Sequence, residues 1–408
     1  MKQCRPILRR DVAFLRVSTL AALLAAGAAA VGGVVVGCQR SGDSTHSTAA
    51  PATAPQPTDW SAFSGGGGLL GQAVLIGPPP YKLRWTYVAS EDGTPIDGGA
   101  AIVDDTAYVG DGAGFVHAIN LATGKARWKS KLESPFETTP LVTAGMVILG
   151  DTAGKMHALD AATGRPLWEY DSGTGIHAAA NLLPTADGAR IVFATDGARV
   201  VCVSMQGKEL WSAEAEDRVN SCPAVADGMV YAAGCDAQLR ALNAADGSLK
   251  WARDLPSLAP GSAAVTDDRI IVGTDGGHVV CWLRHGHTQL WQYDNIEDES
   301  MVYASPAVAD GIVVVGARDR QVHAIDADTG ERRWVFKTRG DVDSTAVISG
   351  GRVYVASKDK RLYVLDLQTG KELWQFTAER PITAPVSIGR GVIVVSDSDG
   401  LVYCLEPK

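Results

Sequence analysis

The chain has 408 residues, of which 46% are hydrophobic and 20% charged, and its formal net charge is -9. Residues 1–38 contain five basic and one acidic side chain, so the rest of the chain carries a net charge of -13. An acidic body of this kind argues against nucleic-acid binding and against docking on anionic lipid by charge alone. The length is sufficient for a large core, and the 45 glycines suit many short strands joined by tight turns.

The first 37 residues have the pattern of an export signal. A basic segment ends at Arg16, and a weakly apolar run of 21 residues continues to Gly37. The run ends in Val35-Val36-Gly37-Cys38, which resembles the lipobox of bacterial lipoproteins, where a peptidase cleaves before a cysteine that receives lipid. We therefore expect residues 1–37 to be a lipoprotein signal peptide and Cys38 to be lipidated. The alternative is a transmembrane anchor. In either case we expect an exported, membrane-anchored protein that faces the periplasm, with the outer membrane favoured.

Residues 38–80 are rich in Ser, Thr, Ala, Pro and Gly. Because this composition cannot bury enough apolar surface to order itself, we expect a low-complexity tether. The short segment Trp60-Ser61-Ala62-Phe63 interrupts the tether, and we expect it to dock on the domain that follows.

Residues 81–408 contain a tryptophan repeat. Eight tryptophans are separated by 43, 40, 43, 40, 40, 43 and 40 residues; they are Trp85, Trp128, Trp168, Trp211, Trp251, Trp291, Trp334 and Trp374. A period of about 40 residues is typical of a propeller blade, which must stack on its neighbours to bury both faces. The repeat predicts an all-β, eight-bladed propeller of four-stranded antiparallel blades. Residues 382–406 supply only three strands, and the strand around Trp85 is expected to complete that blade and close the ring.

The repeat unit itself resembles a known family. It reads Ala-Ile/Leu-Asp/Asn-x-x-Thr-Gly-x-x-x-Trp and occurs, for example, from Ala118 to Trp128 and from Ala324 to Trp334. This unit is similar to the tryptophan-docking repeat of pyrroloquinoline-quinone (PQQ) propellers. The resemblance implies that each tryptophan packs between adjacent blades and is structural.

Two branches of that superfamily carry different functions. Quinoprotein dehydrogenases bind PQQ and calcium in the propeller funnel, and they carry a vicinal disulfide that this chain lacks. The outer-membrane assembly lipoproteins of the BamB family are eight-bladed scaffolds behind a lipobox, and the chain resembles this branch more closely. The resemblance implies a non-enzymatic, monomeric scaffold that binds envelope proteins, including β-barrel assembly components, without a cofactor. The alternative is a PQQ-dependent oxidoreductase with calcium.

Few cysteines and histidines stand out as candidates for chemistry. Cys222 and Cys235 fall in one blade on either side of an Asp-Gly turn, so a disulfide between them is a candidate in an oxidising compartment. Histidines 117, 157 and 323 recur at one repeat position, which indicates a scaffold role. No metal-binding motif is apparent in the sequence.

One polar constellation emerges from aligning the repeats. The residues three positions before the Pro or Ala of each innermost strand are Asp97, Glu137, His177, Asn220, Pro260, Tyr303, Asp343 and Ile382. Because innermost strands line the channel of a propeller, these side chains are expected to ring one of its mouths. The carboxylates are expected to gather negative potential there and to bind a cation, a ligand or a basic protein segment. The alternative is a solvated polar rim.

Overall fold

The computed structural model describes residues 58–408 except 286–287, 295 and 298–299. The expected signal peptide, the lipidation site Cys38 and the first part of the tether therefore lie outside the described residues. No helix among the residues described is long and apolar enough to cross a membrane.

Each repeat unit folds into one four-stranded antiparallel blade. In the sixth blade, Asp310 and Gly311 adopt φ angles of 51° and 72° at the turn between the first two strands, as a tight hairpin requires. The two middle strands of that blade are almost wholly buried, whereas half of the residues in the outermost strand are exposed. The apolar runs of the repeat therefore form the blade centres, and the polar outer strands face solvent.

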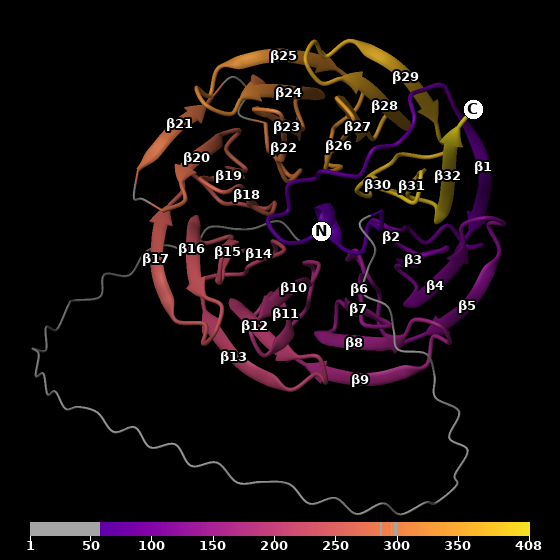
Figure 1. The fold of residues 1–408 in the computed structure, drawn as a ribbon, viewed down its shortest axis with the longest axis horizontal. Coiled ribbons are helices and arrows are strands. Elements are labelled where there is room, and N and C mark those ends of the chain that lie inside the picture. The colour runs from indigo at the N-terminus through magenta and orange to yellow at the C-terminus, as the bar shows by residue number, and fades with distance from the viewer. Residues whose placement is uncertain (1–57, 286–287, 295, 298–299) are drawn as a thin grey trace, which may run out of the picture. The chain divides into compact units, whose positions relative to one another are not determined.

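The eight sheets are numbered here in chain order (Figure 1). Blades one to four contain β2 (Ala101–Val103), β3 (Thr106–Gly110), β4 (Phe115–Asn120), β5 (Ala126–Lys131); β6 (Leu141–Thr143), β7 (Met146–Gly150), β8 (Lys155–Asp160), β9 (Pro166–Asp171); β10 (Asn181–Thr185), β11 (Gly188–Thr195), β12 (Arg199–Ser204), β13 (Glu209–Glu214); and β14 (Ala224–Ala226), β15 (Met229–Ala233), β16 (Gln238–Asn243), β17 (Leu249–Asp254). Blades five to eight contain β18 (Ala264–Val265), β19 (Arg269–Gly273), β20 (Val279–Leu283), β21 (Gln289–Tyr293); β22 (Ala307–Ala309), β23 (Ile312–Ala317), β24 (Gln321–Asp326), β25 (Arg332–Lys337); β26 (Val347–Ser349), β27 (Arg352–Ala356), β28 (Arg361–Asp366), β29 (Glu372–Thr377); and β30 (Ser387–Gly389), β31 (Val392–Ser396), β32 (Leu401–Pro407), β1 (Tyr81–Val88).

The eighth blade joins the two ends of the repeat array. β1 pairs antiparallel with β32, with Trp85 opposite Cys404, and the strand order in the sheet is β1-β32-β31-β30. Figure 1 shows β1 and β32 side by side at the rim of the ring. The predicted eight-bladed propeller and its closure by the Trp85 strand are confirmed.

Within the described part of the chain, seven of the eight repeat tryptophans contact the next blade. In six cases the indole Nε1 donates to a backbone carbonyl of the following blade at 2.8 to 3.0 Å; the pairs are Trp85–Leu121, Trp128–Ala161, Trp168–Met205, Trp211–Ala244, Trp291–Ala327 and Trp334–Leu367. Trp374 instead packs edge-on against Tyr81 of the eighth blade, with ring centroids 5.2 Å apart. Trp251 packs against Tyr231 within its own blade.

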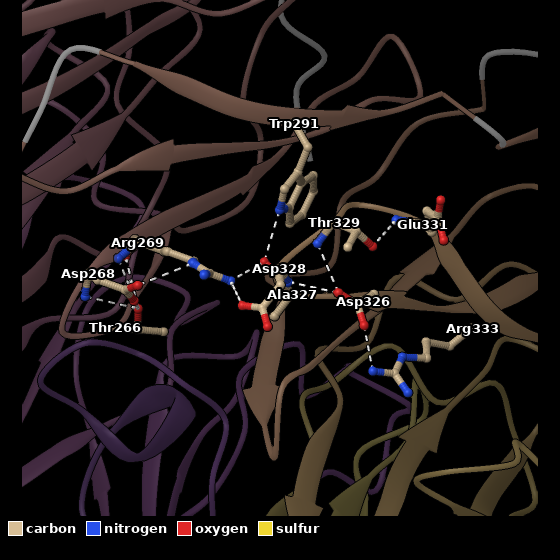
Figure 2. A network of polar contacts seen from close by, with 10 residues as sticks. All are labelled: Thr266, Asp268, Arg269, Trp291, Asp326, Ala327, Asp328, Thr329, Glu331 and Arg333. Carbon is tan, nitrogen blue, oxygen red and sulfur yellow. Dashed lines mark hydrogen bonds and ion pairs between the residues drawn. The ribbon is translucent and has the colours of Figure 1, made fainter.

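Figure 2 shows one such joint, between the fifth and sixth blades. The Ala327 carbonyl accepts hydrogen bonds from both Trp291 and the guanidinium of Arg269. Arg269 also pairs with Asp328 at 2.5 Å, and the Asp326 carboxylate caps the same turn through the Thr329 amide at 2.8 Å. The joint therefore combines a buried aromatic ring with a network of polar contacts to one turn.

An N-terminal strap, residues 58–76, packs on the inner rim of the propeller. It contains the short 3-10 helix η1 (Phe63–Gly65), and its Trp60, Leu69 and Ile76 side chains are no more than 3% exposed. Figure 1 shows this indigo segment at the centre of the ring. The expected docking of Trp60 is thus observed, but the structure differs from the expected tether over residues 58–76. Backbone pairing and a few apolar anchors order this segment despite its glycine-rich composition.

Candidate functional site at the channel mouth

The polar constellation lies just ahead of the innermost strands. Asp97, Glu137 and His177, like their counterparts in the later blades, stand four residues before the first residue of the strand that follows. In the eighth blade that position belongs to Thr383, because β30 begins at Ser387. Ile382 is instead fully buried in the core. The placement of Ile382 in the ring was therefore wrong by one residue.

His177 forms the centre of one half of the ring. Its Nδ1 lies 2.9 Å from Glu137 Oε2, and its Nε2 lies 3.3 Å from Asp196 Oδ2. The hydrogen bonds that His177 donates, first to Asp196 and second to Glu137, raise the pKa of His177 to about 9. The hydrogen bond from His177 in turn holds the pKa of Glu137 below its ordinary value. At neutral pH the imidazolium therefore bridges two carboxylates.

Asp97 lies near Glu137 of this cluster, and Asn220 holds the equivalent repeat position in the fourth blade, next along the ring. Burial and the nearby Glu137 charge raise the pKa of Asp97, against a weaker opposing effect from the Thr383 hydroxyl, which donates to Asp97 at 3.3 Å. Asn220 Oδ1 and Asp196 Oδ1 are buried oxygen atoms that have no hydrogen-bond partner within the described part of the chain. This half of the mouth therefore retains unused acceptor capacity and an excess of negative charge.

Asp343 forms the centre of the other half. Arg318 donates to both of its carboxylate oxygens at 3.0 Å, and Lys358 Nζ lies 2.8 Å from Oδ2. Burial alone would raise the pKa of Asp343, but these two cations outweigh it and hold the pKa below its ordinary value. The Arg318 guanidinium also stacks on the Tyr303 ring, 3.9 Å from its centroid. The expected negative potential is therefore neutralised at Asp343.

The alignment of the repeats did not include Arg318, Lys358 or Asp196, because these residues come from a second set of loops. Asp196, Arg318 and Lys358 all follow the second strand of their blades rather than preceding the first. A charged residue one or two positions after the second strand of a repeat is the signal that could have revealed them, because that loop faces the same end of the channel.

A divalent cation or a PQQ–calcium pair does not fit these residues. A protonated His177 offers no lone pair to a metal, and Asp343 already accepts from two cationic side chains. Across the described ranges, no group of three or more His, Cys, Asp or Glu side chains could hold a metal ion. His177 and Asp343, the centres of the two halves, are therefore held in ion pairs with neighbouring side chains.

The candidate disulfide is not formed. Cys222 is a free, buried thiol whose pKa is raised by burial. Ala224 of β14 lies opposite Tyr231 of β15, so Cys222 faces about residue 233, and Cys235 lies beyond the end of β15. The register expected from the sequence is observed, and Cys222 is not bonded to Cys235.

The recurring histidines have the scaffold role that their spacing indicated. Nε2 of His117, His157 and His323 lies 2.8 to 2.9 Å from a buried carboxylate in the preceding turn of the same blade, at Asp111, Asp151 and Asp319 respectively. Tyrosines of the preceding blade contact the other ring nitrogen of two of them; the pairs are Tyr87–His117 at 3.0 Å and Tyr293–His323 at 2.9 Å. These buried chains fix turns and blade contacts.

The fold and the repeat chemistry define an eight-bladed propeller of the PQQ-like class. The sequence model of the outer membrane protein assembly factor BamB matches residues 79–182, 174–294, 253–347 and 338–408. The chain belongs to the BamB family.

Individual relatives agree with this family assignment. BamB of Yersinia pestis is 26% identical over 279 residues, which cover 65% of this chain and 69% of that protein. BamB of Salmonella typhimurium is 31% identical over 271 residues, covering 62% and 66% of the two chains. The crystal structure of BamB from Moraxella catarrhalis superposes with a TM-score of 0.68 at 19% identity, covering 81% of this chain and 98% of that one.

Quinoprotein enzymes share the fold alone. The quinohemoprotein alcohol dehydrogenase of Comamonas testosteroni superposes with a TM-score of 0.72 but is only 14% identical, covering 85% of this chain and 80% of that one. The similarity reflects the common propeller scaffold, which hosts unrelated functions.

Proposed function

We propose that this protein is a non-enzymatic scaffold of the bacterial cell envelope that takes part in outer-membrane protein assembly. The observation that carries the proposal is the BamB family match, which extends over the whole propeller from residue 79 to residue 408. The scaffold acts as a monomer, held at the outer membrane by lipid on Cys38, and binds β-barrel assembly components without a cofactor. The acidic body of the chain supports a protein partner over nucleic acid.

The half of the channel mouth around Glu137 is the face that we assign to a protein partner. Asp97, Glu137 and Asp196 outnumber the single imidazolium there, and two buried oxygen atoms have no hydrogen-bond partner among the residues that the structure describes. A lysine or arginine side chain can donate to several acceptors at once and carries the complementary charge. We therefore expect a basic segment, rather than a metal ion, to be the preferred occupant.

Deletion of the gene in the bacterium that encodes the protein tests the scaffold role. We expect lower amounts of folded outer-membrane β-barrel proteins, restored by the wild-type gene. Unchanged amounts of folded barrels in the deletion strain would count against the assembly role. Addition of PQQ and calcium to the purified protein tests the enzymatic alternative, since reduction of an artificial electron acceptor by an alcohol or sugar would favour the oxidoreductase.

A further inference from the structure

The strap contacts every blade of the propeller. Its backbone carbonyls accept hydrogen bonds from the second residue of six innermost strands; the pairs are Trp60–Ile102, Ser61–Val142, Gly67–Val225, Gly68–Val265, Leu70–Val308 and Gly71–Ile348, at 2.7 to 2.9 Å. The third blade binds Gly67 through the Asn181 side chain, which both accepts at 3.0 Å and donates at 2.8 Å. In the eighth blade the Arg390 amide donates to the Thr58 carbonyl at 2.9 Å.

These contacts repeat at one register position of the blades. An innermost strand has one edge that faces the channel, where its backbone amides have no strand to pair with. The strap satisfies one such amide in six of the blades, in the way that an added strand pairs with a sheet edge. The inner rim therefore offers a circular array of backbone donors, which the strap follows with a short 3-10 helix and several left-handed residues.

The rim also holds side chains of the strap. Leu69 is 1% exposed and packs in the cluster around Ala224, Ala263 and Val265. A Cβ on the preceding residue, Gly68, would lie 2.3 Å from the Val265 carbonyl oxygen. A Cβ on Gly71 would lie 2.9 Å from both Ala307 Cβ and the Ala346 carbonyl oxygen. The rim thus selects glycine at two positions three residues apart, with a leucine-sized anchor between them.

The strap and the charged mouth lie at opposite ends of the channel. The ring residues precede the innermost strands, whereas the strap begins beside the hairpin turns that follow them, where the Asp104 amide donates to Asp59 at 3.3 Å. Asp59 also pairs with Arg390 at 2.5 Å in the turn after β30. The rim is therefore a second surface, separate from the mouth around Glu137.

We propose that this rim is a peptide-binding site, filled in the resting molecule by residues 58–76. Its ligand class is a glycine-rich polypeptide segment that can adopt the left-handed angles of the strap, with two glycines spaced as Gly68 and Gly71 are and an aliphatic residue in the position of Leu69. Recognition rests on backbone hydrogen bonds to several blades at once, so such a segment in another chain competes with the strap. This inference is independent of the scaffold role and of the channel mouth.

Strap exchange in the folded, full-length protein tests the inference. A protease site inserted between Gly77 and Pro78 allows the strap to be cut from β1 after folding, so that it stays in place only through its contacts. A fluorescent peptide of residues 58–76 is then added in excess, and its retention on the propeller is measured by anisotropy and gel filtration. We expect the peptide to bind to the cut protein and to displace the cut strap.

Binding of variant strap peptides to the cut protein measures the sequence specificity of the rim. The Gly68→Val peptide should bind about tenfold more weakly or worse, because its side chain collides with the Val265 carbonyl. The Leu75→Ser peptide should bind like the wild type, because Leu75 is 76% exposed. Cut protein that stays folded by circular dichroism but never takes up the peptide would overturn the proposal, as would equal binding of the Gly68→Val peptide.

Discussion

The indole of Trp85 lies directly against Gly124, and this contact joins the last blade to the first. A Cβ on Gly124 would lie 2.6 Å from Trp85 Cγ, and the Trp85 Nε1 donates to the Leu121 carbonyl of the same turn at 2.8 Å. Gly124 has a φ of 69°, which other residues adopt at a cost. The same turn therefore needs glycine both for its backbone angle and for the space that the ring occupies.

Gly124→Ala should weaken ring closure. The left-handed backbone and the collision with Trp85 together should lower the free energy of unfolding by about 2–4 kcal/mol. Guanidinium denaturation followed by circular dichroism measures the change. Gly391→Ala is the matched control, because Gly391 has a φ of 74° but no atom within 4 Å of its built Cβ. The control should lose only about 1 kcal/mol, and equal losses in both variants would show that the Trp85 contact contributes little.

The repeat predicts the blades because the same local features, a tryptophan, a glycine and an Asp-Gly turn, recur at the same positions in many of the repeat units. Trp85 and Gly124 could thus be assigned without knowing which blades meet. The strap could not be assigned in this way. Its contacts run through backbone groups that every residue carries, and Gly68 is informative only once the Val265 carbonyl is placed beside it.

The pH dependence of stability should reflect His177. Its pKa in the folded protein is about 9, above the unfolded value of 6.5, so its contribution is fully present below pH 6.5 and is lost as the pH rises through 9. The side chain is 28% exposed, so we expect a contribution on the order of 1–3 kcal/mol. The free energies of unfolding of the wild type and of His177→Gln, measured by chemical denaturation, should differ most near pH 6 and converge near pH 10.

A direct titration separates this ion pair from other effects of the substitution. The imidazole resonance of His177, followed by NMR, should show a midpoint well above pH 8. A midpoint below pH 7 would mean that Glu137 and Asp196 do not hold the imidazolium.

Membrane attachment should depend on Cys38. Cys38→Ser should abolish incorporation of labelled fatty acid, because only a thiol accepts the lipid, and it should release the protein from the membrane fraction. Cys4→Ser is the control, since it removes a thiol from the same N-terminal region and should leave labelling unchanged. Labelling that persists in the Cys38→Ser protein would exclude the lipoprotein proposal.

The site was only partly predictable from the sequence. Aligning the first strands located Asp97, Glu137, His177 and Asp343 at one mouth, because a repeat position maps to one place in the ring. Their charge states depend on loops that the alignment did not include. Arg318 reaches Asp343 from another loop, so the local sequence around Asp343 gives no sign of neutralisation.

The last prediction concerns metal ions at the mouth. Calorimetry with calcium and with zinc should show no tight binding to the wild-type protein. A metal at His177 must displace a proton whose pKa is about 9, which costs roughly a hundredfold in affinity at pH 7. At Asp343 a metal must compete with Arg318 and Lys358. The Glu137→Gln, Asp343→Asn double variant removes one carboxylate from each half of the ring and should behave like the wild type. Heat of metal binding that is present in the wild type and absent from this variant would show that the ring binds a metal ion. It would then count against a basic protein segment as the preferred occupant.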